Sequence, residues 1–446
     1  MASPRYESDD VDVSPLGQPL PFPFSGQTAK NRFLKAAMTE RLSSWDPQKL
    51  EARGIPSKGL INAFKRWGEG GFGVILTGNT MIEYDQLEAP GNPIIPRGAP
   101  FSGERFEAFA ELARQSKKHG SLIISQISHP GRQVQDAVQP DPVSASDVRL
   151  EGNVMGMTFA KPHAATSEEI KNIIEGFAHA AEYLHRAGYD GIELHGAHGY
   201  LLSQFLSPTT NQRTDQYGGS LANRSRLIME IAQAIRERVP QSFILSIKIN
   251  SVEFQDKGFN PEECRELCRE LEANRFDFVE LSGGTYESLA FAHKRESTKK
   301  REAFFLDFAE TIAPALKETK IYITGGFKTA GAMVHALQTV HGVGLARPST
   351  LEPSFPNDIL AGTVTGAIKQ RLDENNFGLT NVAAGTQIRQ LARDQQPVDL
   401  SNEENVKGFM DDMGKWGEAM GKDKEHKMYG YVDLSAQPVP YRVATS

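Results

Sequence analysis

Cysteine, an excess of basic residues and long apolar runs are all missing from this chain of 446 residues. Its only two cysteines, Cys264 and Cys268, lie one helical turn apart, which excludes an iron–sulfur cluster and a disulfide framework. Acidic residues outnumber basic ones, 56 against 49, which argues against a nucleic-acid-binding protein. No run approaches the roughly 18 apolar residues of a membrane span, and the polar N-terminus has no signal-peptide features. We therefore expect a cytoplasmic protein without nucleic-acid or membrane partners.

Short apolar runs recur along the chain, with amphipathic stretches between them. The eight runs that we expect to form strands are RFLKAAM, FGVILTG, LIISQIS, DGIELHG, FILSIKI, DFVELSG, KIYITGG and GVGLARP. Most are nearly continuous in hydrophobic residues, which is typical of parallel strands buried on both faces. Eight strand–helix units predict an α/β fold of the (β/α)8 type, a TIM barrel. An open doubly wound sheet is the alternative, but no Gly-x-Gly-x-x-Gly turn follows the first strand.

The chain divides into three parts. We expect an N-terminal arm over residues 1–29, the barrel over 30–370 and a C-terminal extension over 371–446. Residues 129–165, after the third strand, are too long for a plain connection and are well placed for a lid. One helical face of the extension collects apolar side chains, which we expect to cover the barrel, although a contact between subunits of a homo-oligomer also fits. These side chains are Val406, Phe409, Met410, Met413, Trp416 and Met420.

Catalytic groups of such barrels lie at the carboxyl ends of the strands. That rule collects Thr39, Gly78, Gln126, His195, His198, Tyr200, Lys248, Gly325, Gly326, Ala346 and Arg347. The loops after the seventh and eighth strands are where barrel enzymes usually hold phosphate. The two glycines there allow close backbone approach and Arg347 adds a fixed charge, so these loops predict a phosphorylated ligand.

Two histidines and a tyrosine, His195, His198 and Tyr200, follow the fourth strand within six positions. A metal site is the less favoured explanation, because a catalytic metal usually needs three protein ligands and the first strand lacks a His-x-His pair. Two neutral imidazoles can instead donate hydrogen bonds to one substrate oxygen, and a tyrosine can deliver a proton. We therefore predict a proton-handling site without a metal, although an ordinary loop that contains imidazoles is also consistent with the pattern.

The segment from His195 to Arg226, HGAHGYLLSQFLSPTTNQRTDQYGGSLANRSR, resembles the signature of the Old Yellow Enzyme family. This is a family of FMN-dependent NAD(P)H oxidoreductases and ene-reductases. Further matches to the family are NRFLKAAMT, GVILTGN, SQISHPGR, LSIKINS, TGGF and LARP, spread over the predicted barrel. The extension carries no motif that can be placed.

The resemblance implies which residues bind FMN: Ala36, Ala37, Met38, Thr39, Gly78, Gln126, Lys248, Gly325, Gly326, Ala346 and Arg347. Thr39 would lie near the C4 carbonyl of the flavin, and Gly78 would leave room for the ring. Gln126 would bond the pyrimidine edge. Lys248 would stand beside N1 and the C2 carbonyl, where a cation stabilises the reduced flavin. The glycines after the seventh strand and the Ala346–Arg347 pair would hold the 5′-phosphate.

The resemblance also implies a substrate site. His195 and His198 would bind the electron-withdrawing oxygen, and Tyr200 would protonate the α-carbon after flavin N5 delivers hydride to the β-carbon. Many members have Asn as the second partner, so His198 places this chain with the His/His variants. Arg41 stands where some of those variants have Tyr. Pointing inward, it would bind an anionic or strongly polar substrate; pointing outward, it would be a solvated charge.

We therefore expect an FMN-dependent enzyme that takes hydride from NADPH or NADH. Its substrate would be a small electrophilic alkene or a quinone, such as an enone, a nitroalkene or a benzoquinone. A flavin-free barrel lyase or isomerase acting on a phosphorylated substrate would use the same phosphate site, and a flavoprotein scaffold retained for binding is the third hypothesis. The basic run HKRESTKKR, residues 293–301, could meet the 2′-phosphate of NADPH, although charged loops are usually just solvated.

Overall fold

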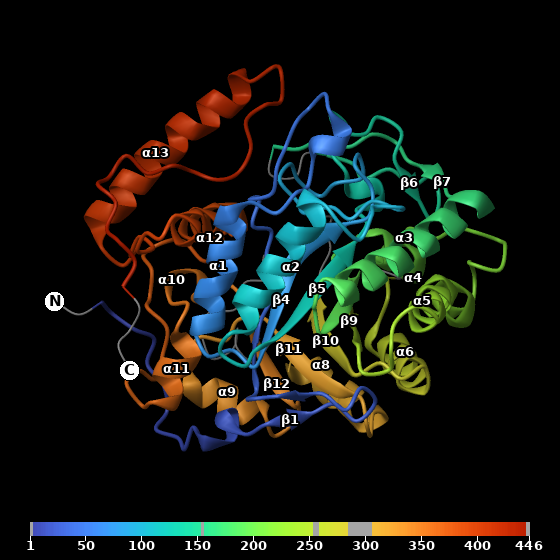
Figure 1. The fold of residues 1–446 in the computed structure, drawn as a ribbon. Coiled ribbons are helices and arrows are strands. Elements are labelled where there is room, and N and C mark those ends of the chain that lie inside the picture. Colours follow the sequence, from blue (N-terminus) through green and yellow to red (C-terminus); the bar gives the residue numbers. More distant parts are fainter. Residues whose placement is uncertain (1–2, 153–155, 253–257, 284–305, 443–446) are drawn as a thin grey trace.

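The computed structural model of the chain describes residues 3–152, 156–252, 258–283 and 306–442. Eight parallel strands close into a barrel with helices around it (Figure 1). In order around the barrel, these are β3 (Phe33–Lys35), β4 (Val74–Met81), β5 (Leu122–Ser128), β8 (Gly191–Gly196), β9 (Ile244–Val252), β10 (Phe278–Gly283), β11 (Lys320–Thr324) and β12 (Gly342–Leu345). Each of the eight predicted runs overlaps one of them, so the predicted (β/α)8 barrel is confirmed.

Burial on both faces explains why the strands read as continuous apolar runs. Every residue of β4 and β5 is buried, since one face fills the barrel and the other lies under helices. The ladder between these strands is regular up to Thr77 and Ser125, then shifts before Thr80. The irregularity leaves Gly78 and Asn79 outside the ladder, at the carboxyl end of β4. Asn79 can therefore line the cavity that opens there.

The helices on the outside of the barrel are α1 (Lys58–Glu69), α2 (Glu104–Lys117), α3 (Ser167–Arg186), α4 (Leu201–Leu206), α5 (Leu221–Arg236), α6 (Pro261–Ala273), α8 (Leu306–Ile312), α9 (Ala330–Ala336), α10 (Pro348–Leu351) and α11 (Phe355–Leu360). Side-chain caps mark where several of them begin. In α3, the Thr166 hydroxyl accepts the N–H of Glu169, whose carboxylate accepts the N–H of Thr166. Ser57, Ser220 and Asn260 cap α1, α5 and α6.

The N-terminal arm closes the amino end of the barrel. Its strands β1 (Leu20–Pro21) and β2 (Thr28–Ala29) form an antiparallel hairpin. Leu20 and Phe22 pack among the inward side chains at the starts of the barrel strands. The ring centroids of Phe22 and Phe278 are 5.6 Å apart. This end is therefore plugged by apolar packing, and the ligand-sized cavity formed by the described residues lies at the carboxyl end.

The insertion after β5, residues 129–165, carries a small parallel sheet of its own. This sheet pairs β6 (Val143–Ser144) with β7 (His163–Ala164). His129 is buried and accepts the N–H of Gly131 through Nδ1 at 3.0 Å. That histidine therefore folds into its own loop. Further along the insertion, a few side chains reach the cavity at the barrel mouth.

The C-terminal extension forms α12 (Phe377–Ala392) and α13 (Glu403–Lys422). The apolar face predicted for α13 exists, and Phe409 on it is buried. Its packing partners come from α12 and from the segment around Val432. Other residues of the same face, Met413, Trp416 and Met420, line the cavity at the barrel mouth, so the helix covers part of this end of the barrel together with α12. α12 packs beside α1, and α13 lies outside α12 (Figure 1).

Cys264 and Cys268 are both buried on α6 and form no disulfide. Within the described part of the chain, no helix has the length and apolar character needed to cross a membrane.

Candidate active site

A cavity of about 1790 Å³ opens at the carboxyl ends of the strands. Most residues singled out from the sequence line it: Ala37, Met38, Thr39, Arg41, Gln126, His195, His198, Tyr200, Lys248, Gly325, Gly326, Ala346 and Arg347. The insertion after β5 and both helices of the extension supply further parts of its wall. The cavity thus brings together residues from all eight strand ends and from the distant C-terminal extension.

Two predicted residues, Ala36 and Gly78, lie beside the cavity without lining it. Ala36 is fully buried and donates its N–H to the carbonyl of Leu345 at 2.9 Å. Gly78 donates its N–H to Glu40 Oε1 at 3.0 Å. A Cβ atom at Gly78 would lie 1.7 Å from the carbonyl oxygen of Met38. The space left by this glycine is therefore taken by the chain after β3, so the expectation that it makes room for a flavin ring does not match the geometry.

A sharp turn after β8 gathers the histidines and the tyrosine. His198 and Gly199 both adopt left-handed backbone conformations, with φ of 59° and 77°. Such a conformation is uncommon for histidine, and the N–H of His198 is held by Asn250 Oδ1 at 3.1 Å. The turn brings His198 back beside His195 and starts α4 at Leu201, which donates its N–H to the carbonyl of His129.

The two imidazoles contact each other through one ring nitrogen each. His195 Nε2 lies 3.1 Å from His198 Nδ1. On their outer sides, His195 Nδ1 lies 2.7 Å from Asn79 Oδ1 and His198 Nε2 lies 2.9 Å from Ser282 Oγ. Burial lowers the pKa of His195 well below its ordinary value, with further contributions from His198 and Lys248. Burial also lowers the pKa of His198 to about 3. Both rings are therefore neutral at neutral pH.

A neutral imidazole has one N–H donor, so the outer partners decide what the pair offers to a ligand. The Ser282 hydroxyl can donate to His198 Nε2, which leaves the proton of His198 on Nδ1. When His195 donates to Asn79, its Nε2 is an acceptor and only His198 can donate to a ligand. When His195 instead accepts from the Ser128 hydroxyl, 3.3 Å away, its Nε2 carries the proton. In that state two N–H groups can meet at one oxygen.

Tyr200 completes this group. Its ring centroid lies 4.6 Å from that of His195, and 5% of its surface is exposed. The residue is the N-cap of α4, and its carbonyl accepts the N–H of Gln204 at 2.8 Å. Tyr200 is therefore held on a fixed backbone, in the wall of the cavity beside the histidine pair.

Polar side chains from four neighbouring strands, β5, β8, β9 and β10, line the barrel interior next to the cavity. Lys248 Nζ donates to Glu280 Oε1 at 2.9 Å, and Gln126 Nε2 donates to Glu193 Oε1 at 2.7 Å. All four side chains are buried. Gln126 and Lys248 also line the cavity, so they can present an amide and a cation to a ligand.

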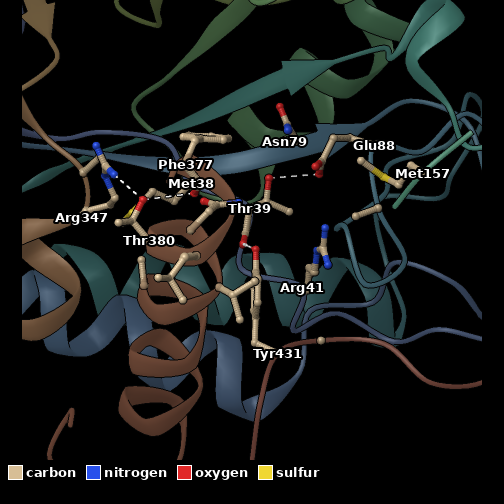
Figure 2. Close-up of a pocket in the computed structure, with 18 of the residues that line it drawn as sticks. Met38, Thr39, Arg41, Asn79, Glu88, Met157, Arg347, Phe377, Thr380 and Tyr431 are labelled. Atoms are coloured by element: carbon tan, nitrogen blue, oxygen red, sulfur yellow. Dashed lines mark hydrogen bonds between the residues drawn. The ribbon is translucent and has the colours of Figure 1, made fainter. Parts of the chain in front are cut away.

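The loops after β11 and β12 form the other end of the cavity. Gly325 and Gly326 have φ of 148° and 82°, which only glycine adopts readily. The hydroxyl of Thr324 is buried in the cavity wall and has no hydrogen-bond partner among the described residues. Arg347 Nη1 donates to Thr380 Oγ1 of α12 at 2.7 Å (Figure 2). This end combines accessible backbone, a hydroxyl and a guanidinium, which suits a phosphate group.

Arg41 is half-buried and lines the cavity (Figure 2). Its guanidinium lies 4.9 Å from the centroid of the Tyr431 ring. The Tyr431 hydroxyl donates to the carbonyl of Thr39 at 2.8 Å, and the Thr39 hydroxyl donates to Glu88 Oε2 at 3.0 Å. This part of the wall therefore carries both a cation and a carboxylate.

Several of these residues escaped the sequence analysis. Asn79 stands directly after Gly78 in a motif that was already singled out. Glu280 lies inside an apolar strand, and a carboxylate in such a run is itself a signal, because it is rarely buried without a partner. Nothing in the sequence around Tyr431 indicates its role, because that role depends on a contact with Thr39, which lies far away in the sequence.

Two further expectations concern residues away from this group. The basic run 293–301 lies outside the residues that the structure describes. Within the described ranges, no group of three or more His, Cys, Asp and Glu side chains is arranged to hold a metal ion.

A sequence model of the NADH:flavin oxidoreductase / NADH oxidase family matches residues 18–364. The chain belongs to this family. NADH-dependent flavin oxidoreductase nadA of Aspergillus parasiticus is 53% identical over 97% of this chain and 98% of its own length. NADH-dependent flavin oxidoreductase iliE of Hypocrea jecorina is 32% identical over 75% of this chain and 86% of its own. The Old Yellow Enzyme homologue of Zymomonas mobilis shares the fold, with a TM-score of 0.65 at 22% identity, over 82% of this chain and 98% of that one.

As a member of the NADH:flavin oxidoreductase family, the protein is a flavin-dependent oxidoreductase that uses FMN and a nicotinamide reductant. This finding sets aside the flavin-free lyase or isomerase. The cavity fits the cofactor: the partnerless Thr324 hydroxyl and the two glycines lie at one end, and Gln126 and Lys248 at the other. Its volume of about 1790 Å³ exceeds the roughly 300–1,000 Å³ of most ligand sites, which leaves room for a second molecule beside the cofactor.

Proposed function

We propose that this flavin oxidoreductase reduces activated C=C bonds of small electrophiles such as enones, nitroalkenes and quinones. The observation that carries the proposal is the neutral histidine pair, with His195 Nε2 and His198 Nδ1 3.1 Å apart and Tyr200 packed against it. In the tautomer with the His195 proton on Nε2, the pair offers two neutral donors that converge on one point, which suits the carbonyl or nitro oxygen of an acceptor.

The pair would polarise the acceptor through its oxygen. Hydrogen bonds from both imidazoles stabilise negative charge that develops on that oxygen, and inside a buried site such bonds are worth more than in water. Both rings are neutral, so they can bind an uncharged acceptor in the protonation state that they already have at neutral pH. Tyr200 would then deliver its hydroxyl proton to the carbon that becomes nucleophilic.

FMN, when bound, supplies the hydride that it has received from the nicotinamide. Gln126 and Lys248 would bind its pyrimidine edge, and the Lys248 ammonium would oppose negative charge there. The chain from Ala37 to Thr39 would lie along the ring. The phosphate would sit in the loops after β11 and β12, bonded by the backbone of Gly326 and Ala346 and by the guanidinium of Arg347.

The polar wall opposite the strand ends would select the acceptor. The Arg41 guanidinium faces the cavity and favours a substrate with an anionic or strongly polar group. Glu88 lies in the same wall, so a substrate hydroxyl could replace Thr39 as the donor to its carboxylate. Both residues act on substrate choice and take no part in the proton transfer.

A two-step anaerobic experiment tests the proposal. The FMN-loaded protein is first reduced with NADH or NADPH and then mixed with cyclohexenone, a nitroalkene or a quinone. We expect rapid flavin reoxidation, with an enone product saturated at the former double bond. Flavin that stays reduced with all three acceptors, and is reoxidised only when air is admitted, would show that the protein is not a reductase of activated alkenes or quinones.

A further inference from the structure

A buried group of charged side chains lies beside the cavity, and its carboxyl groups outnumber its ammonium groups by one. Glu193 on β8, Lys248 on β9 and Glu280 on β10 come from three adjacent strands of the barrel. No side-chain surface of Glu193 or Glu280 is exposed, and only 5% of the Lys248 side chain is. Two carboxyl groups therefore share the barrel interior with one ammonium group.

The hydrogen bonds of the two carboxyl groups indicate which of their oxygens could bind a proton. Glu280 Oε1 accepts from Lys248, and Glu193 Oε1 accepts from Gln126. The other oxygen of each, Oε2, is buried and accepts nothing from any donor among the described residues. The two side chains stand on the strands that flank β9, the strand of Lys248, and both are fully buried. Two ionised carboxylates in that position would repel each other without water to screen them.

Among the residues that the structure describes, no neighbouring group supplies the missing positive charge. Lys35 is bound to Glu40, with 3.4 Å between Nζ and Oε1, so that pair balances itself. Burial keeps both imidazoles above the pair neutral. Burial and the charge of Glu280 raise the pKa of the Glu193 carboxyl well above its ordinary value, in agreement with the geometry. The titratable groups around the pair are His195, His198, Lys35, Glu40 and Lys248.

We propose that Glu193 and Glu280 share one proton, which Glu193 donates to Glu280 Oε2, so that the group formed with Lys248 has no net charge. Glu280 is the ionised member because Lys248 binds it directly. Glu193 also positions the side chain of Gln126, because its Oε1 accepts a hydrogen bond from the Gln126 amide. The shared proton does not depend on a cofactor. Its second consequence rests on the proposed function: loss of the proton would place an uncompensated negative charge beside FMN.

Infrared difference spectroscopy on the cofactor-free protein tests the shared proton directly. Glu193→Gln keeps both hydrogen bonds, because its amide can donate to Glu280 and its carbonyl can accept from Gln126. We expect this variant to lose the C=O band of a protonated carboxylic acid at neutral pH. Glu280→Gln is the matched variant: the remaining Glu193 should ionise, so the same acid band should disappear. Loss of a carboxylate band in either variant, with no acid band lost, would overturn the proposal.

The pH dependence of stability gives a second readout. The folded-state pKa of Glu193 lies above the unfolded value of about 4.3, so its contribution to stability is lost as pH rises above that value. The unfolding constant of the wild type should therefore increase relative to that of Glu193→Gln by up to about tenfold per pH unit above pH 5, until the shared proton is released. A ratio that does not change with pH would contradict the shared proton.

FMN binding separates this inference from the proposed function. The wild type should bind FMN about tenfold more weakly once the shared proton is lost at high pH, whereas Glu193→Gln should bind it equally at both pH values. Flavin fluorescence measures both constants. An acid band that disappears as expected, with FMN affinity unchanged by pH, would support the shared proton and overturn the position of FMN beside Lys248.

Discussion

The wall of the cavity has two halves that are built in different ways. One half consists of strand ends, and its histidine pair and Tyr200 stand within six positions of one another. The other half comes from the C-terminal extension, where Tyr431 binds the carbonyl of Thr39 across 392 positions of sequence. The first half is fixed by the barrel ladder and a local turn, the second by contacts between distant segments. We therefore propose that the strand ends carry the chemistry and that the extension supports the wall in which Arg41 and Glu88 select the substrate.

The strongest test of this division is Tyr200→Phe. Delivery of a proton to carbon is needed in the reduction of an enone but not in the reduction of FMN by nicotinamide. The step with cyclohexenone should therefore slow by about 10² to 10⁴, with flavin reduction nearly unchanged. A quinone should suffer far less, because its oxygens can take protons from water. Stopped-flow absorbance follows both steps, and equal slowing of the two would assign Tyr200 to nicotinamide positioning.

A second test removes the histidine pair. In the double variant His195→Ala/His198→Ala, a phenol, which mimics the acceptor oxygen, loses two hydrogen bonds of about 0.5–1.5 kcal/mol each. Its affinity, measured by titration of the flavin spectrum, should fall about tenfold to a hundredfold. The FMN content should stay normal. If the variant instead lost FMN, this would show that the histidines hold the cofactor.

The third test uses the charge state of His198. Its pKa of about 3 in the folded protein lies below the unfolded value of about 6.5, so the folded state resists protonation. Stability is therefore complete above about pH 6.5 and falls as the pH decreases toward 3. Between pH 7 and pH 5, the wild type should lose about 1–2 kcal/mol relative to His198→Asn, which cannot titrate. Urea unfolding at both pH values measures the difference, and parallel curves would mean that the imidazole is not desolvated.

The smallest effect is expected in the extension. Tyr431→Phe removes one hydrogen bond to the backbone of Thr39, which is worth about 1 kcal/mol. We expect the KM for the acceptor to change about fivefold, with the rate of flavin reduction unchanged. Tyr431→Ala, the control, also removes the ring beside Arg41 and should shift the preference toward bulkier acceptors. If Tyr431→Phe slowed the proton-transfer step as Tyr200→Phe does, the two halves would not have separate roles.

The barrel was predictable because burial on both faces leaves a strong apolar signal in each strand. The strand ends were less predictable. The first strand was expected to reach Met38 but stops at Lys35, because the next residues leave the ladder to reach the cavity. Gly78 illustrates the same limit. The space that a side chain would need at this position is occupied by the carbonyl oxygen of Met38, which lies on a neighbouring segment. A single sequence does not show which segment will lie there.

The candidate site divides in the same way. The histidines and Tyr200 could be placed because a turn of six residues is a local property. Glu88 and Tyr431 could not, since each contributes through a contact with Thr39 that only the assembled fold creates. Glu280 is the intermediate case: its presence in an apolar strand was visible, whereas its partner Lys248 depended on the register of β9 and β10.

The contact between Thr39 and Tyr431 has a consequence for how the protein comes into being. A ribosome adds about 5–20 residues per second, so the 392 positions between the two residues take roughly 20–80 s to translate. Within that time, the strand ends that carry the histidines are made before the wall that faces them, and the last barrel strand ends at Leu345. From then until Tyr431 is made, a nascent chain carries a barrel mouth that the Tyr431 segment does not yet cover.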